Sequence, residues 1–180
     1  MLVHKYLPNY SVEDYNRWEG DWELIQGIPY SLLPSPVRKH QELSREILCQ
    51  ISNSINGQKN DFRSCYVVYT LDWIVNNNTV VRPDISVNCD NTGDFITKAP
   101  ALIVEILAPS TEVKDKYLKF ELYEEQGVKN YIIADPNLKT YQVYELINGH
   151  YQEKKDLSSF EIHDKCSIQI NLDEALAELD

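Results

Sequence analysis

The 180-residue sequence predicts an α/β (α+β) fold, in which helices flank a central mixed β-sheet, and a single domain over residues 1–180. With 43% hydrophobic residues, a chain of this length fits one compact core. Residues 101–107 and 129–136 form two apolar, β-branched stretches separated by a helical stretch at 109–127. This order implies a right-handed crossover between strands. An amphipathic helix at 35–55 adds a second helical layer.

The first part of the chain is predicted to contain a short helix, a hairpin and the long helix. Residues 10–18 favour an opening helix with Ser11 as its N-cap. Residues 22–33 predict a β-hairpin, because a glycine separates two apolar runs. Helical spacing of apolar residues in 35–55 directs one face inward and puts His40 in the first turns. These apolar residues are Val37, Leu43, Ile47, Leu48, Ile51 and Ile55.

The strands of the sheet are predicted where β-branched and aromatic residues gather between Asn, Gly and Pro turns. Residues 101–107 are apolar on both faces apart from Glu105, as in a central strand. The helix that follows begins at Ser110 or Thr111 and ends at Gly127. The other predicted strands are residues 65–75, 82–87, 129–136 and 139–146.

Composition limits the class of protein. The formal net charge of −11 argues against a general polyanion-binding surface, although Arg38, Lys39 and Arg45 cluster and leave room for a local basic face. No apolar run has the length of a signal-peptide core or a membrane span, so we expect a cytoplasmic protein without membrane contact. The four cysteines lack metal-binding spacing and are expected to be reduced, mostly packed thiols.

Two carboxylates interrupt the predicted strands. Asp84 follows a proline at the start of one strand, and Glu105 lies among apolar neighbours in the next. Burying a lone carboxylate is costly unless a cation or several donors compensate it. A structural salt bridge, for instance with Arg82, would explain one such acid. Two acids directed to the same side of neighbouring strands favour a shared divalent metal instead.

The following helix is predicted to direct Lys119 toward the sheet. At about 100° per residue, Lys114, Glu121 and Glu125 fall on the presumed solvent face, and Lys119 lies nearly opposite. Asp115 lies one turn earlier on the same stripe, so an ordinary i,i+4 ion pair with Lys119 is one interpretation. The other is a lysine beside a metal, where it would orient water or hold an anionic phosphate.

The block from Pro83 to Pro136 resembles the PD-(D/E)XK nuclease superfamily. RPDISV, LIVEILAPST and GVKNYIIADP occur in this order, with Asp115, Lys119 and Tyr123 before the last of them. Within the superfamily, the chain is most similar to the Uma-type restriction-endonuclease-like proteins, formerly a domain of unknown function. WELIQG and PSPVRKH also correspond to this branch, and the similarity runs from about residue 11 to residue 151.

The resemblance implies a restriction-endonuclease-like core with a metal-dependent phosphodiesterase site. Asp84 and Glu105 would coordinate Mg²⁺, for which Mn²⁺ can substitute, and the metal would polarise phosphate and activate water. Glu23 would be an additional acid near the metal, and His40 would line the same pocket near phosphate. A solvated strand acid and a helix-end histidine are equally open interpretations of these two residues.

One feature departs from the superfamily pattern. Its third motif is usually Glu-x-Lys on the strand, but Leu107 stands two residues after Glu105. Lys119 of the following helix would be the migrated equivalent. Tyr123 lies on the same inward stripe and is a candidate to hydrogen-bond a site group, with Asp115 as a further candidate.

The sequence leaves three hypotheses for function open. The first is a Mg²⁺-dependent endonuclease that hydrolyses nucleic acid, with DNA as the expected substrate, and acts as a homodimer. The second is a metal-free hydrolase, in which paired carboxylates cleave glycosides and Tyr66 and Trp73 serve as sugar platforms. The third is a non-catalytic interaction module that retains the fold and binds metal weakly or not at all.

Overall fold

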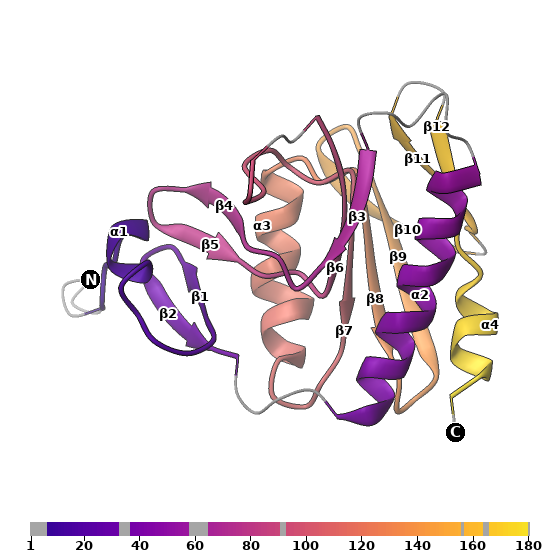
Figure 1. Ribbon diagram of the computed structural model, residues 1–180, viewed down its shortest axis with the longest axis horizontal. Coiled ribbons are helices and arrows are strands. Elements are labelled where there is room, and N and C mark those ends of the chain that lie inside the picture. The colour runs from indigo at the N-terminus through magenta and orange to yellow at the C-terminus, as the bar shows by residue number, and fades with distance from the viewer. Residues whose placement is uncertain are drawn as a thin grey trace.

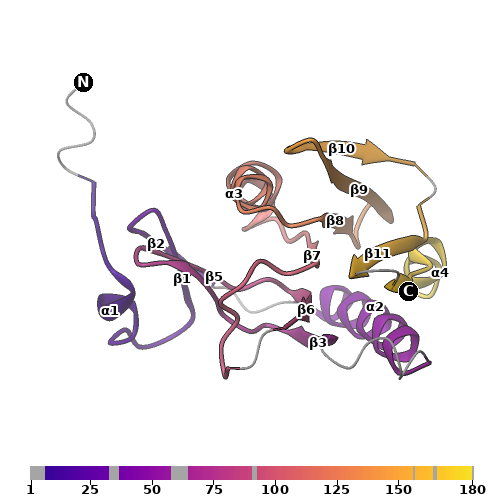
Figure 2. The same ribbon diagram turned by 90° about the horizontal axis from the view of Figure 1, so that it is seen from above.

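A six-stranded mixed β-sheet forms the centre of the molecule. The computed structural model describes residues 7–32, 37–57, 65–90, 93–155, 157–163 and 166–179. Over these residues the strands form this sheet, a four-stranded sheet at one end of the molecule, and a separate two-stranded hairpin (Figures 1 and 2). The predicted α+β class with a central mixed sheet is therefore confirmed.

The strands of the large sheet are β3 (Cys65–Tyr69), β6 (Ile85–Cys89), β7 (Leu102–Ile106), β8 (Asn130–Asp135), β9 (Thr140–Ile147) and β10 (His150–Lys154). Their order across the sheet is β10-β9-β8-β7-β6-β3. β7 and β8 are parallel, whereas the other neighbouring pairs are antiparallel. The predicted strand–helix–strand crossover accordingly joins β7 to β8.

Helices cover both faces of this sheet (Figure 2). The long helix α2 (Arg38–Gly57) packs on one face. The segment between β7 and β8 packs on the other face and consists of a π-helical part, η2 (Lys114–Lys119), continued by α3 (Phe120–Glu125). None of the helices in the described ranges is long and apolar enough to cross a bilayer.

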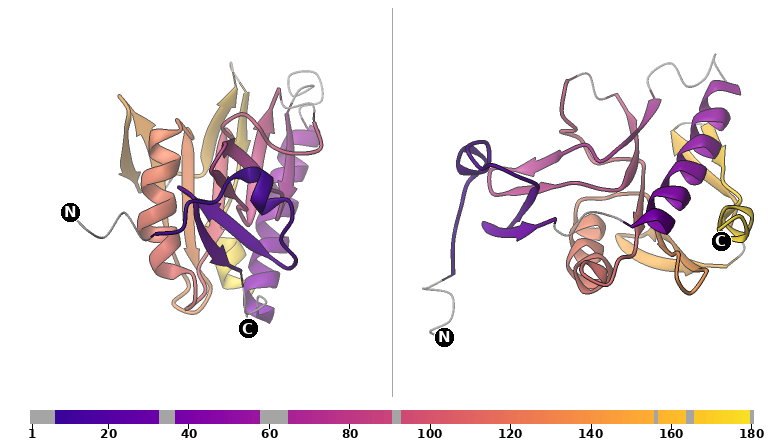
Figure 3. Two further views of the ribbon diagram at one scale, coloured as in Figure 1. Left: turned by 90° about the vertical axis from the view of Figure 1, so that its left-hand side faces the viewer. Right: turned by 60° about the horizontal axis from the view of Figure 1, so that its bottom comes forward.

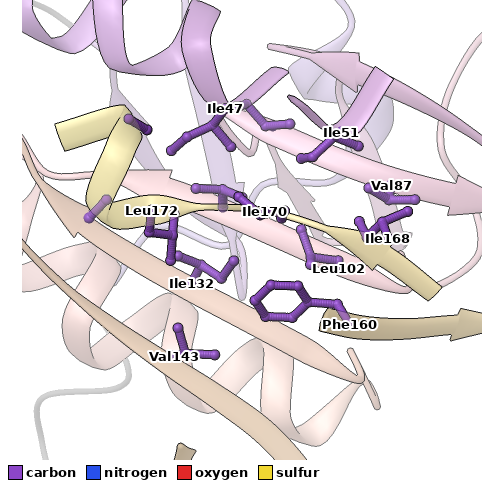
Figure 4. Close-up of a cluster of buried hydrophobic side chains, with 14 of the residues drawn as sticks. Ile47, Ile51, Val87, Leu102, Ile132, Val143, Phe160, Ile168, Ile170 and Leu172 are labelled. Carbon is purple, nitrogen blue, oxygen red and sulfur yellow. The ribbon is translucent and has the colours of Figure 1, made fainter. Parts of the chain in front are cut away.

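The larger hydrophobic core lies between α2, the sheet and the C-terminal elements. These elements are the hairpin β11 (Ser159–His163)–β12 (Cys166–Gln169) and the short helix α4 (Leu172–Ala177). Figure 4 shows that side chains from α2, from sheet strands and from the hairpin all point into this core. Labelled members are Ile47, Ile51, Val87, Leu102, Ile132, Val143, Phe160, Ile168, Ile170 and Leu172.

The four-stranded sheet and the first helix form the N-terminal end of the fold (Figure 3). Its order is β2-β1-β5-β4. The predicted hairpin is confirmed, and the Ser11 side chain accepts a hydrogen bond from the Asp14 N–H as the predicted cap of the first helix. The elements are α1 (Val12–Tyr15), β1 (Trp22–Ile25), β2 (Ile28–Ser31), β4 (Trp73–Asn76) and β5 (Thr79–Val81).

Two predicted details of these elements are wrong. The stretch 65–75 is not one strand, because Thr70 has a positive φ of 48° and its N–H donates to the Asp84 carbonyl. This turn sends β3 into the large sheet and β4 into the small one. Val37 does not face the core: it precedes α2 and is 62% exposed.

The expectation of reduced, mostly packed cysteines is wrong for two of the four. Cys65 and Cys89 are opposite each other in the antiparallel β3–β6 pair and form a disulfide. They are 24 residues apart in sequence, so only the strand register brings them together. Cys49 is a free thiol, but it is exposed on α2. The side chain of Cys166 lies outside the described part of the chain.

Candidate active site

A single cavity of about 580 Å³ gathers most of the predicted site residues. Its walls come mainly from α2, from the residues just before β6, from the end of β7 and the turn after it, and from η2. Glu23 and Tyr123 do not line the cavity, but each bonds to a residue that does. The predicted residues that line the cavity are His40, Asp84, Glu105, Asp115 and Lys119.

Asp84 is held at the junction between strands β6 and β7. Its Oδ2 accepts a hydrogen bond of 2.7 Å from the Ile106 N–H and lies 3.2 Å from Nε2 of His40. Burial alone lowers the pKa of His40, but its hydrogen bond to Asp84 and the charge of that carboxylate outweigh burial and raise the pKa. The pair therefore favours an imidazolium beside a carboxylate.

Glu105 lies in the middle of β7 and is buried on the α3 side of the sheet. Its Oε1 accepts a 2.7 Å hydrogen bond from the Tyr123 hydroxyl and a 2.8 Å charged hydrogen bond from Lys119. Burial raises the pKa of Glu105 to about 8; Lys119 opposes this rise, while the nearby charges of Asp115 and Asp84 add to it. The carboxylates around Glu105 thus carry more negative charge than Lys119 alone neutralises.

Each of the two strand carboxylates keeps one oxygen without a protein donor. Among the described residues, no hydrogen bond or ion pair reaches Oδ1 of Asp84 or Oε2 of Glu105. The Asp84 side chain is 20% exposed, whereas that of Glu105 is only 3% exposed. Because both residues line the cavity, these two oxygens are available to a ligand within it.

Lys119 is a buried ammonium surrounded by three carboxylates. Its Nζ lies 2.8 Å from Glu23 Oε1, 2.8 Å from Glu105 Oε1 and 3.6 Å from Asp115 Oδ1, and the side chain is only 2% exposed. Burial would lower the pKa of Lys119, but the three carboxylates raise it well above its ordinary value. Lys119 therefore stays protonated.

Two charged residues of the π-helical segment η2 reach the same cavity, as their i,i+4 spacing predicts. Asp115 and Lys119 are both buried there, and π-helical turns often occur at functional sites. The predicted i,i+4 contact between them is confirmed, but it belongs to a larger buried network. Burial raises the pKa of Asp115 even though Lys119 opposes the rise.

Lys114 is the functional candidate that the sequence interpretation missed. We expected it on the solvent face, but its side chain is only 10% exposed and forms an ion pair with buried Glu23. The expectation assumed 3.6 residues per turn, whereas the i→i+5 bonding of η2 widens the turn and rotates the first residues inward. The signal in the sequence was Lys114 itself, which precedes Lys119 by a spacing of about one π-helical turn.

The structure contradicts one detail of each of two alternative interpretations. Arg82 does not pair with Glu105: its guanidinium binds Asp72 and Asp21, both at 2.7 Å. Trp73 cannot serve as a sugar platform, because it is 2% exposed and stacks on Tyr123 inside the smaller core.

Asp84 and Glu105 provide a donor set that suits Mg²⁺. The described residues contain no group of three or more His, Cys, Asp or Glu side chains arranged to hold a metal. Mg²⁺ does not need such a cage, since it commonly binds through one or two carboxylates and completes its shell with water and substrate phosphate. Two carboxylates that line one cavity, each with an oxygen that no donor among the described residues contacts, meet this requirement.

The fold is that of a restriction-endonuclease-like protein, and its cavity combines acids at two adjacent strands with a lysine on the helix that follows. A family model, Uma2, described as "Putative restriction endonuclease", matches residues 12–170. The chain belongs to this family. Its resemblance to the PD-(D/E)XK superfamily and to its Uma-type branch is thereby confirmed.

Similar individual proteins include a cyanobacterial sequence and a solved structure. "Uncharacterized protein slr1290" from Synechocystis sp. is 32% identical over 125 residues, which cover 65% of this chain and 63% of that protein. The aligned part thus spans less than two thirds of this relative. The crystal structure of a "putative nuclease belonging to DUF820" from Anabaena variabilis superposes with a TM-score of 0.74 over 94% of this chain and 99% of that one. Because the two sequences are only 16% identical, this similarity shows a shared fold alone.

Proposed function

We propose that the protein is a Mg²⁺-dependent endonuclease that hydrolyses phosphodiester bonds in nucleic acid, with DNA as the expected substrate. Asp84 and Glu105 would hold the metal, and Mn²⁺ would substitute for Mg²⁺. When bound, the metal would polarise the phosphate and lower the pKa of a coordinated water. The observation that carries this proposal is the presence of two partly unsatisfied strand carboxylates and a buried, protonated lysine in one cavity.

The side chains of the site have separate roles in this proposal. Lys119 would stabilise negative charge that develops on the phosphate, because a buried cation interacts more strongly than one in water. His40 would keep Asp84 oriented through Nε2, which lies 3.2 Å from Asp84 Oδ2. Tyr123 would fix the rotamer of Glu105 through its hydroxyl.

A cleavage assay with the Glu105→Gln variant tests this function. Wild type and variant are incubated with single-stranded DNA, duplex DNA and RNA in the presence of Mg²⁺, of Mn²⁺ or of a chelator. We expect metal-dependent cleavage by the wild type and at least a 100-fold loss in the variant, because one metal ligand loses its charge. Cleavage that persists in the variant or in chelator would contradict the site assignment, and inactivity on all substrates would favour the interaction module.

We also propose that the protein acts as a homodimer, because two copies of a short domain can contact both strands of a nucleic-acid duplex. Sedimentation velocity over a range of protein concentrations measures the oligomeric state. A mass of about twice the chain's 20.9 kDa is expected, and a monomer at all concentrations would refute the dimer.

A further inference from the structure

Glu23 differs from the other acids of the site in its bonding. It lies on β1 of the small sheet, has no exposed surface, and is not among the residues that line the cavity. Its Oε1 accepts a 2.8 Å hydrogen bond from the Arg82 N–H and lies 2.8 Å from Nζ of Lys119. Its Oε2 is paired with Lys114. Both carboxylate oxygens are therefore engaged by protein donors.

This contrast separates Glu23 from the candidate metal ligands. Asp84 and Glu105 each keep an oxygen without a protein donor and line the cavity, and Glu23 does neither. A cation in the cavity would have to displace Lys114 or Lys119 before it could reach Glu23. Burial would raise the pKa of Glu23, yet the two lysines lower it, so Glu23 is ionised and holds them by charge.

On the basis of the proposed function, we infer that Glu23 is a positioning residue. It holds Lys119 beside the metal-binding carboxylates and is not itself a metal ligand. Lys119 contacts Glu23 and Glu105 at equal distances of 2.8 Å. Glu23 therefore draws part of the ammonium charge away from Glu105, which leaves that carboxylate able to accept a divalent cation. The small sheet, which carries Glu23, thereby takes part in the site.

A double-mutant cycle on Mn²⁺ affinity tests this role without a substrate. Calorimetric titrations compare wild type, Glu23→Gln, Lys119→Met and the double variant. We expect Glu23→Gln alone to weaken Mn²⁺ binding by roughly 3- to 10-fold, because Lys119 then neutralises Glu105 more fully. Lys119→Met alone should tighten binding by removing the competing cation. In the Lys119→Met background, the effect of Glu23→Gln should shrink to about 2-fold or less.

Matched variants separate this role from a purely structural one. Lys116→Met removes another η2 lysine, whose partner is the surface residue Glu112, and should leave Mn²⁺ affinity unchanged. Glu23→Asp keeps the charge and is the variant to use if Glu23→Gln does not fold. It should retain Mn²⁺ affinity within about 2-fold while kcat falls more than KM rises, because Lys119 is displaced.

The outcomes distinguish the inference from the function on which it rests. If Glu23→Gln weakens Mn²⁺ binding equally with and without Lys119, or if Glu23→Asp abolishes binding, Glu23 is a metal ligand and the inference fails alone. If the wild type binds no Mn²⁺, the metal site fails and the inference fails with it. An effect of Glu23→Gln that depends on Lys119 supports both.

Discussion

Replacing Lys119 with methionine should destabilise the metal-free protein strongly. The substitution keeps the apolar stem and removes an ammonium group whose Nζ lies 2.8 Å from both Glu23 and Glu105. Removing one partner of a buried ion pair typically costs about 3–5 kcal/mol. Although Lys119 has more than one partner, we expect a value within this range, because Glu105 can neutralise itself by taking up a proton.

The loss of stability should depend on pH. Burial already raises the pKa of Glu105 to about 8, and that of Asp115 is raised as well. Without Lys119, which lowers both values, they should rise further. Glu105 is then protonated between pH 5.5 and 8 in both proteins, so the pH dependence of the difference comes mainly from Glu23. In the wild type Lys119 and Lys114 lower the pKa of Glu23 against burial, and without Lys119 that pKa should rise, so the variant is stabilised by proton uptake as the pH falls. The difference between wild type and variant should be largest at pH 8 and should shrink as the pH falls.

Urea unfolding in the presence of a chelator, at pH 8 and pH 5.5, measures this difference. Lys116→Met is the matched control, because its ion pair with Glu112 lies at the surface and should contribute about 0–1 kcal/mol. If Lys119→Met loses less than about 1 kcal/mol at pH 8, or if its loss grows as the pH falls, the buried charge network does not exist as described.

Three further predictions concern neighbouring features. Tyr123→Phe deletes the hydroxyl that donates to Glu105 and should cost about 1–3 kcal/mol in urea unfolding; an unchanged midpoint would contradict this hydrogen bond. In chelator, Glu105→Gln should flatten the pH dependence of stability between pH 4.5 and about 8. The raised pKa of the Glu105 carboxyl adds stability below pH 4.5, and this stability is lost as the pH rises through 8. Equal slopes of stability against pH in wild type and variant would refute this. Reducing the Cys65–Cys89 disulfide, which closes 24 residues, should lower stability by about 3 kcal/mol; thiol titration of the unfolded, unreduced protein should find both cysteines unreactive.

Much of the candidate site could be predicted because it lies on regular elements. The alternation of a strand places Glu105 on one face, and a proline followed by β-branched residues places Asp84 at the start of the neighbouring strand. Lys119 and Tyr123 lie on the predicted inward face of the helix after β7, and both donate hydrogen bonds to Glu105.

The rest depended on geometry that local patterns do not encode. A π-helical turn buried Lys114, although an ideal α-helix would expose it. The positive φ of Thr70 divided one apolar run between two sheets. The Cys65–Cys89 disulfide follows from strand register, which the spacing of the two cysteines does not reveal.

Calorimetric titration of the wild type and of Asp84→Asn with Mn²⁺ tests the proposed metal site most directly, because it requires no knowledge of the substrate. Asparagine keeps the shape of the side chain and removes its charge. We expect the wild type to bind Mn²⁺ with a defined stoichiometry and Asp84→Asn to lose that binding. Binding that survives in Asp84→Asn, or a wild type that binds no Mn²⁺, would contradict a metal held by the strand carboxylates.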